Sequence, residues 1–245
     1  MTTTEGISRK LPAGVVAVVV SLSMLALGAC GAPAPDTTGL VPPTTAAPPG
    51  PLAIAIGDSI TQFSRDRLAF ELVARGWNTS VLGRAGATID DMRASLLGAA
   101  TLKPKALVIE LGSNDLGYAS DPDRTDPDDW SDAVNDAIGR IGRTLDDVAA
   151  VPCIVWVNVT DWTNFFGYDT RRSGPRFNAA LAAAATQDPR LHVVDYAGLF
   201  RPDTPERAAA LEVDFDAQRL HPTTKVAVDA WVQAVGNTVD RSCRT

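Results

Sequence analysis

Apolar residues gather in five short runs between residues 52 and 194. The runs cover residues 52–56, 106–111, 151–159 and 191–194, and the fifth candidate, residues 77–82, mixes three apolar with three polar residues. Runs of this length, bounded by Gly, Pro or polar residues, are typical of buried β-strands. We therefore expect five strands.

Longer segments with helical periodicity separate these runs. In one of them, Val134, Ile138, Ile141, Leu145 and Val148 follow each other at three- and four-residue spacing, which is typical of a helix that faces a core. Thr88 is expected to cap the second helix. The predicted helices cover residues 65–75, 89–102, 130–149, 171–185 and 223–239, with an acidic loop over 117–129 and an irregular segment up to residue 220.

The alternation of short strands with helices predicts the fold class. It indicates βαβ units and a parallel, doubly wound sheet in an α/β protein. We expect a five-stranded, flavodoxin-like sheet in a three-layer α/β/α sandwich.

Residues 1–30 differ from the rest of the chain and indicate an export signal. Arg9 and Lys10 precede an apolar stretch over residues 13–27, which is short for a membrane span. The sequence Leu-Gly-Ala-Cys that ends at Cys30 resembles the lipobox of bacterial lipoproteins. This resemblance implies cleavage before Cys30 and lipid attachment to its sulfur. Secretory cleavage nearby and an uncleaved anchor are the alternatives, and all three place the remaining chain outside the cytoplasm.

Residues 31–51 are rich in Pro, Thr and Ala. Such a composition does not bury enough apolar surface to fold, so the segment is expected to be a disordered, semi-stiff linker. It would hold the folded domain, residues 52–240, away from the membrane.

Charge and motif content exclude several functions. The net charge is −7, without a basic patch, which argues against nucleic acid as a partner. Two His and three Cys, none of them clustered, make a metal site improbable. The chain also lacks a phosphate-binding loop, a dinucleotide fingerprint, an H-E-x-x-H motif and the G-x-S-x-G elbow. No cofactor is expected.

Cysteine usage suggests one disulfide. If Cys30 carries a lipid, Cys153 and Cys243 remain as a pair in an oxidising compartment. A bond between them would tie the C-terminal tail to the fourth strand. The alternative is that Cys153 is an inert thiol in the core.

Four residues suited to acyl-transfer chemistry lie just after a strand or at the start of a helix. Ser59 follows the first strand, Gly86 the second and Asn114 the third, and His221 opens the last helix. In an open parallel sheet these positions converge on one edge. Ser59 would be a nucleophile and His221 its base. Backbone N–H groups of Gly86 and Ser59, with the Asn114 amide, would stabilise an oxyanion.

This ordered set resembles the SGNH subgroup of the GDSL hydrolases. Gly57-Asp58-Ser59 matches the nucleophile motif, Gly86 the oxyanion glycine, Asn114 in Gly112-Ser113-Asn114-Asp115 the oxyanion asparagine, and His221 the catalytic base. The resemblance covers residues 52–239. It implies the SGNH hydrolase fold and hydrolysis of esters and thioesters on lipids, aryl esters and acetylated sugars.

One position departs from the pattern of this family. The family usually has an Asp three residues before the catalytic His, and Gln218 stands there. Asp216 and Asp214 lie further from His221. A bulged loop could bring Asp216 to Nδ1 of His221, or the oxygen of Gln218 or a backbone carbonyl could accept that proton in a Ser–His dyad. A weakened or inactive enzyme is the third alternative.

Other polar and aromatic residues have expected structural roles. His192 begins the fifth strand, far from the site, and is assigned no role. Asp58 and Asp115 are expected to organise loops, and Trp156 to lie in the core. Three aromatic residues in the loop after the fourth strand are candidates for lining an acyl or aryl pocket: Trp162, Phe165 and Phe166.

The sequence therefore predicts a lipid-anchored, extracytoplasmic serine esterase that acts on an ester of a lipid, a glycan or a small alcohol. Two alternatives remain open. In an acyltransferase, a sugar hydroxyl would replace water, and in a non-catalytic binding module, the fold would bind ligand without turnover.

Overall fold

The computed structural model describes residues 50–119, 127–165 and 168–244. The predicted signal segment, its lipidation site Cys30 and nearly all of the linker lie outside these residues. Among the described helices, none is both long and apolar enough to cross a membrane.

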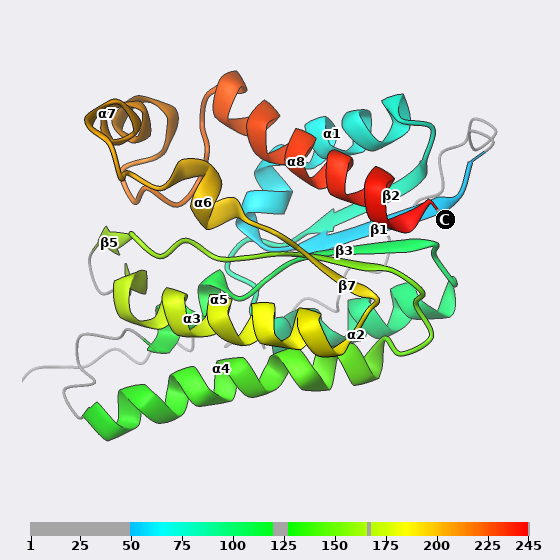
Figure 1. The fold of residues 1–245 in the computed structure, drawn as a ribbon, viewed down its shortest axis with the longest axis horizontal. Helices are drawn as coiled ribbons and strands as arrows, with labels where there is room; N and C mark the ends of the chain where they lie inside the picture. Colours follow the sequence, from blue (N-terminus) through cyan, green and yellow to red (C-terminus); the bar gives the residue numbers. More distant parts are fainter. Residues whose placement is uncertain (1–49, 120–126, 166–167, 245) are drawn as a thin grey trace, which may run out of the picture. The chain divides into compact units, whose positions relative to one another are not determined.

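A five-stranded parallel sheet forms the centre of the described domain (Figure 1). Its strand order is β2-β1-β3-β4-β7, and all four neighbouring pairs are parallel. The strands are β1 (Leu52–Gly57), β2 (Asn78–Gly83), β3 (Ala106–Glu110), β4 (Ile154–Val157) and β7 (Leu191–Val194). The predicted doubly wound, flavodoxin-like sheet is confirmed.

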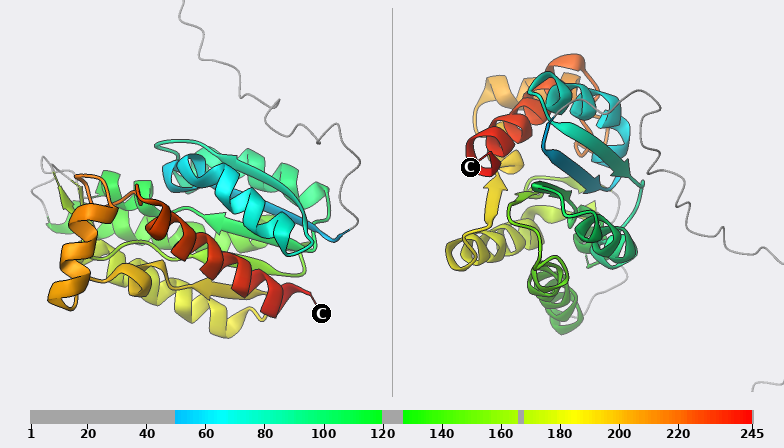
Figure 2. Two further views of the ribbon diagram at one scale, coloured as in Figure 1. Left: turned by 90° about the horizontal axis from the view of Figure 1, so that it is seen from above. Right: turned by 90° about the vertical axis from the view of Figure 1, so that its right-hand side faces the viewer.

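Helices cover both faces of this sheet, which gives the predicted three layers (Figure 2). One face carries α1 (Ser59–Ala74), α6 (Tyr196–Phe200), α7 (Pro205–Asp214) and α8 (Lys225–Cys243). The other carries α2 (Ile89–Thr101), α3 (Ser113–Ala119), α4 (Pro127–Asp147) and α5 (Thr170–Gln187). A short antiparallel hairpin, β5 (Asn164–Phe165) and β6 (Tyr168–Asp169), follows β4.

The alternation of side chains along the strands builds two cores. In β1, Ile54 and Ile56 join the cluster beneath α2, α4 and α5, whereas Ala53 and Ala55 join the cluster beneath α1 and α8. Successive strand residues point to opposite faces, so a strand covered on both sides must be apolar throughout. Trp156 of β4 is fully buried, as predicted, and its indole N–H donates to the Leu111 carbonyl at 3.1 Å.

The strand order also fixes where a ligand binds. From β1 the chain moves outward through α1 to β2, and then returns through α2 to β3 on the other side of β1. Open α/β sheets bind ligands at the carboxyl ends of the strands where this reversal occurs. Ser59 follows β1 and Asn114 follows β3, so both lie at this point.

Three segments differ from the prediction. The loop expected over residues 117–129 is shorter, because α3 extends to Ala119 and α4 already begins at Pro127. Helix α1 begins at Ser59 and not at residue 65, because the Asp58 side chain caps it by accepting from the Ile60 N–H at 2.9 Å. The segment expected to be irregular contains α6 and α7. Helix α7 has a Thr204 cap and a Pro in its first turn, which is a favourable helix start.

The structure joins Cys153, just before β4, to Cys243, at the end of α8. Both side chains are buried. This bond fixes α8 against the sheet at the end of the helix that is remote from His221.

Replacing both cysteines with alanine is expected to lower the free energy of unfolding by about 2 to 5 kcal/mol, because the disulfide closes a loop of 90 residues in the unfolded chain. Urea unfolding with and without reductant measures this. Reductant should destabilise the parent to the same extent and leave the double variant unchanged. A parent that is insensitive to reductant, with two free thiols after denaturation, would contradict the bond.

Candidate active site

Ser59, His221 and Asp216 form a hydrogen-bonded chain at the carboxyl edge of the sheet. Ser59 Oγ lies 2.7 Å from Nε2 of His221. On the other side of the ring, Nδ1 of His221 contacts Oδ2 of Asp216. A carboxylate on Nδ1 keeps the proton there, so that Nε2 is free to accept the Ser59 proton.

A closed loop explains how Asp216 reaches the imidazole from five residues away. Phe215 and Pro222 pair as an antiparallel bridge, and the Asp216 N–H donates to the His221 carbonyl at 3.0 Å. Arg219 adopts a φ of 54°, in the left-handed region, which lets the loop close. Gln218 is exposed to solvent, so the acceptor that the structure places on Nδ1 is Asp216 and not Gln218.

Gly86 lies in an exposed turn after β2. The turn is closed by a hydrogen bond from the Ala87 N–H to the Arg84 carbonyl at 3.1 Å, and Gly86 has a φ of 73°. A side chain is disfavoured at this φ, which explains the glycine. Ser59, in turn, is the first residue of α1, where backbone N–H groups have no partner within the helix. Both N–H groups are therefore candidates for binding an oxyanion.

Asn114 connects the Gly57-Asp58-Ser59 motif with the turn that carries Gly86. Its side-chain N–H groups donate to Oδ2 of Asp58 and to the Ala87 carbonyl, each at 3.0 Å. Asp58 directly precedes the candidate nucleophile, and Ala87 directly follows Gly86, the candidate oxyanion donor. The structure therefore brings the Ser, Gly, Asn and His motifs to one place.

The sequence profile of the GDSL-like lipase/acylhydrolase family matches residues 55–226, which include all four motifs. The chain belongs to this GDSL family. No curated protein matches it in sequence.

Solved structures with a similar fold include an esterase, a lipolytic protein and the catalytic domain of an acetyltransferase. An acetylxylan esterase from Geobacillus stearothermophilus has a TM-score of 0.57 at 15% identity, over 80% of this chain and 95% of that one. A lipolytic G-D-S-L family protein from Veillonella parvula has a TM-score of 0.55 at 14% identity, over 78% and 98%. The catalytic domain of peptidoglycan O-acetyltransferase A from Streptococcus pneumoniae has a TM-score of 0.51 at 14% identity, over 79% and 94%. At such identities the likeness shows the fold, and the predicted SGNH hydrolase fold is confirmed.

A buried acid pair supports the nucleophile loop of this GDSL protein. Oε2 of Glu110 accepts from the Thr61 N–H at 3.1 Å and the Thr61 hydroxyl at 3.0 Å. Burial, with the neighbouring Asp58 charge, holds the pKa of Glu110 well above its usual range. Burial also raises the pKa of Asp58 to about 6. Of the two carboxyls, Asp58 is the one that accepts from the Asn114 amide.

Asp115 organises the neighbouring loop, as expected. Its Oδ2 accepts from the Ile89 N–H at 3.0 Å, which anchors the start of α2 just after the Gly86 turn. Arg140 lies 3.4 Å from its other oxygen. Burial is the largest influence on this carboxyl and raises its pKa from 3.8 to about 6.

This raised pKa predicts a pH-dependent stability. The native protein holds the Asp115 proton more tightly than the unfolded chain does, so this contribution to stability is complete below pH 3.8 and is lost as the pH rises through 6. Asp115→Asn does not titrate. Between pH 4 and pH 7, the parent is expected to lose about 2 to 3 kcal/mol of unfolding free energy relative to this variant. Urea unfolding at both pH values measures this, and a constant difference would contradict it.

The remaining predicted residues lie away from this chain of contacts or outside the described residues. His192 is at the amino end of β7, distant from the carboxyl edge. Trp162 is half-buried and packs against the core beneath α1 and α8. Phe166 and the side chain of Phe165 are not among the described parts, so their pocket-lining role stays a prediction.

Two residues near the site were not assigned from the sequence. Glu110 had a signal, because it is the charged residue in an otherwise apolar strand. Phe63 had none. It lies one helical turn after Ser59, and its ring centroid is 5.3 Å from that of His221.

Proposed function

We propose that this GDSL-family protein is a serine esterase with a Ser59–His221–Asp216 centre. The observation that carries this proposal is the distance of 2.7 Å between Ser59 Oγ and His221 Nε2, with Asp216 on the opposite ring nitrogen. A nucleophile within hydrogen-bond reach of a base, which is itself held by a third group, is the arrangement of acyl-transfer enzymes.

The three residues have distinct roles in the mechanism. Ser59 attacks the acyl carbonyl while His221 accepts its proton. His221 then donates this proton to the leaving alcohol, which gives an acyl-enzyme on Ser59. Water then attacks the acyl carbon while His221 accepts its proton, and His221 returns this proton to Ser59 Oγ as the acid leaves. Asp216 holds the imidazole in the tautomer that accepts at Nε2.

The negative charge of the tetrahedral intermediate needs donors that are already in position. The N–H groups of Ser59 and Gly86 and the Asn114 amide would provide them. Both amide hydrogens of Asn114 are bonded in the free protein, so one must be shared with the oxyanion. The hydrogen bond to charged Asp58 keeps the amide nitrogen of Asn114, and not the amide oxygen, turned toward the expected oxyanion.

We place the substrate among carboxylic esters of lipids, glycans or small alcohols. None of these steps uses a metal or an organic cofactor. The predicted export signal and the lipobox-like sequence that ends at Cys30 support an extracytoplasmic, lipid-anchored location, in which esters of the cell envelope would be the accessible substrates.

Hydrolysis of p-nitrophenyl acetate and butyrate by the purified protein tests this proposal. We expect turnover by the parent and a large loss in His221→Ala, which removes the base. A folded parent that releases no nitrophenol from either ester, or that shows equal rates with and without His221, would contradict the proposal.

An acyltransferase is the second candidate. The structurally similar domain from S. pneumoniae is named as an O-acetyltransferase, and the same acyl-enzyme could pass its acyl group to a sugar hydroxyl. Formation of an acylated sugar that increases with acceptor concentration, at the expense of free acid, would favour transfer over hydrolysis.

A further inference from the structure

Phe63 is an exposed aromatic residue in contact with the candidate base. Its side chain is 65% exposed, although its ring meets the His221 ring edge-on at 5.3 Å between centroids. Because this exposed ring contacts the candidate base, a ligand bound at His221 would also meet Phe63. Phe70, on the same helix and 62% exposed, instead lies beneath the Arg67 guanidinium at 5.4 Å from its ring centroid.

The direction of proton transfer shows which part of an ester would meet Phe63. His221 must return its proton to the oxygen of the leaving alcohol, so this oxygen lies next to Nε2. The oxyanion is expected to bind the donors of Ser59, Gly86 and Asn114. The alcohol therefore leaves on the His221 side, which is where Phe63 lies.

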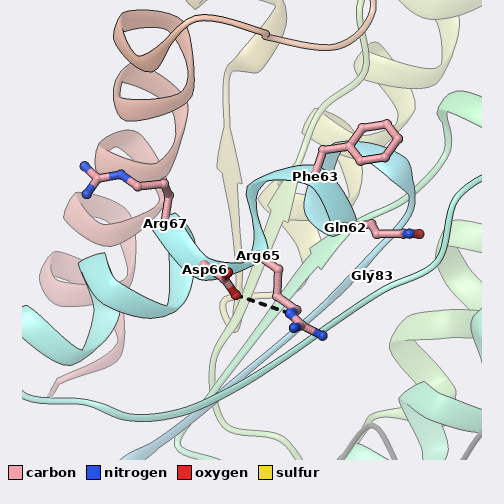
Figure 3. A pocket seen from close by; sticks show the side chains of 6 residues that line it. All are labelled: Gln62, Phe63, Arg65, Asp66, Arg67 and Gly83. Atoms are coloured by element: carbon pink, nitrogen blue, oxygen red, sulfur yellow. Dashed lines mark hydrogen bonds and ion pairs between the residues drawn. The ribbon is translucent and has the colours of Figure 1, made fainter.

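A cleft of about 370 Å³ begins at this residue (Figure 3). It is lined by Gln62, Phe63, Arg65, Asp66, Arg67 and Gly83. Phe63, Gln62 and Arg65 project from one side of α1, while Arg67 turns toward α8, where Asp229 binds it at 2.9 Å.

Two contacts join the residues of this cleft to the turn that carries Gly86. Oε1 of Gln62 accepts from the Ala85 N–H at 2.5 Å. Gly83 packs directly on the first turn of α1, since a Cβ there would lie 2.3 Å from the Gln62 nitrogen. The cleft is thus fixed between the residue that contacts His221 and the turn that carries Gly86.

The chemistry of the cleft favours a carbohydrate. One aromatic face suits the C–H surface of a pyranose ring, and the Gln62 amide, Arg65 guanidinium and Asp66 carboxylate suit its hydroxyl groups. Its volume is at the low end of the roughly 300–1,000 Å³ of ligand pockets. A long lipid chain would need an apolar lining, which these residues do not provide.

We infer that this cleft is the alcohol subsite, that it takes the sugar ring of an O-acylated glycan, and that Phe63 is its specificity-determining residue. This inference rests on the proposed esterase function and names its substrate class.

The test compares an O-acetylated methyl glucopyranoside with ethyl acetate, an ester whose alcohol is too small to cover Phe63. In Phe63→Ala, the ratio of kcat/KM for the sugar ester to that for ethyl acetate is expected to fall about tenfold. Phe63→Tyr, which keeps the ring, and Phe70→Ala, an equally exposed Phe on the same helix, should keep the parent ratio. An equal loss on both esters would overturn the inference, because Phe63 would then act only through His221.

A binding measurement separates this inference from the proposed function. In the full chain carrying Ser59→Ala, NMR titration with the same sugar ester is expected to give a dissociation constant that rises about tenfold when Phe63→Ala is added. If the parent hydrolyses neither ester but this binding persists, the esterase proposal fails and the sugar subsite stands. If both esters are hydrolysed but neither ratio nor binding depends on Phe63, the subsite fails and the esterase stands.

Discussion

Asp216→Asn is expected to lower kcat for ester hydrolysis by about 10⁴-fold, although it changes only one atom. The reason lies in the backbone of the loop. The Leu220 and His221 N–H groups donate to Oδ1 of Asp216 at 3.0 and 3.3 Å. In the Asn variant these two donors keep the amide oxygen at the Oδ1 position, so the amide NH₂ faces His221. Nδ1 must then accept, and the proton moves to Nε2, where it blocks uptake of the Ser59 proton.

Gln218→Ala is the matched control for this prediction. Gln218 stands at the position where the family has its Asp, but it is exposed here, and its replacement should change kcat less than twofold, within the usual scatter for surface positions. Steady-state kinetics on one ester measures both variants. A large loss in Gln218→Ala with a mild effect of Asp216→Asn would reverse the assignment of the orienting group.

Ser59→Ala is expected to have the largest effect of any single substitution, roughly 10⁴- to 10⁶-fold on kcat. It removes the atom that forms the acyl-enzyme and leaves the oxyanion donors in place. The effect on stability should be small, because Ala retains the helix start and the Asp58 cap does not use the Ser59 side chain.

Ser95→Ala, in the middle of α2 and outside the site, provides the matched control. Burst and steady-state phases with p-nitrophenyl acetate, together with circular dichroism, measure both proteins. A folded Ser59→Ala protein that keeps more than a tenth of the parent rate would show that another group carries the nucleophile.

The large sheet could be predicted because its central strands β1, β3 and β4 are buried on both faces and must be apolar throughout. The start of α1 could not be predicted from periodicity, because its first turns bury Ser59, Thr61 and Ser64, which are polar. Helix α7 was missed for a related reason. Its buried residue is Leu211 alone, so the helix has no apolar stripe that periodicity could reveal. Caps were the usable signal in both cases: Asp58 before α1, and Thr204 with Pro205 before α7.

The candidate site also contains residues that the sequence predicts and residues that depend on tertiary contacts. Ser59, Gly86, Asn114 and His221 could be proposed from the sequence because each follows a strand or opens a helix, and parallel topology brings such positions together. The choice between Asp216 and Gln218 depends on the pairing of Phe215 with Pro222, which is a tertiary contact. Spacing along the chain does not encode it. The exposure of Phe63 likewise follows from how α1 docks on the sheet.

Covalent labelling of Ser59 tests the central claim most directly. The purified protein would be incubated with a fluorophosphonate, digested and sequenced by mass spectrometry, beside the His221→Ala variant. The account predicts one phosphonyl adduct, on Ser59, that forms much more slowly without His221 because the hydroxyl is no longer activated. An unlabelled folded parent, or an adduct on another residue that forms equally fast in both proteins, would contradict it.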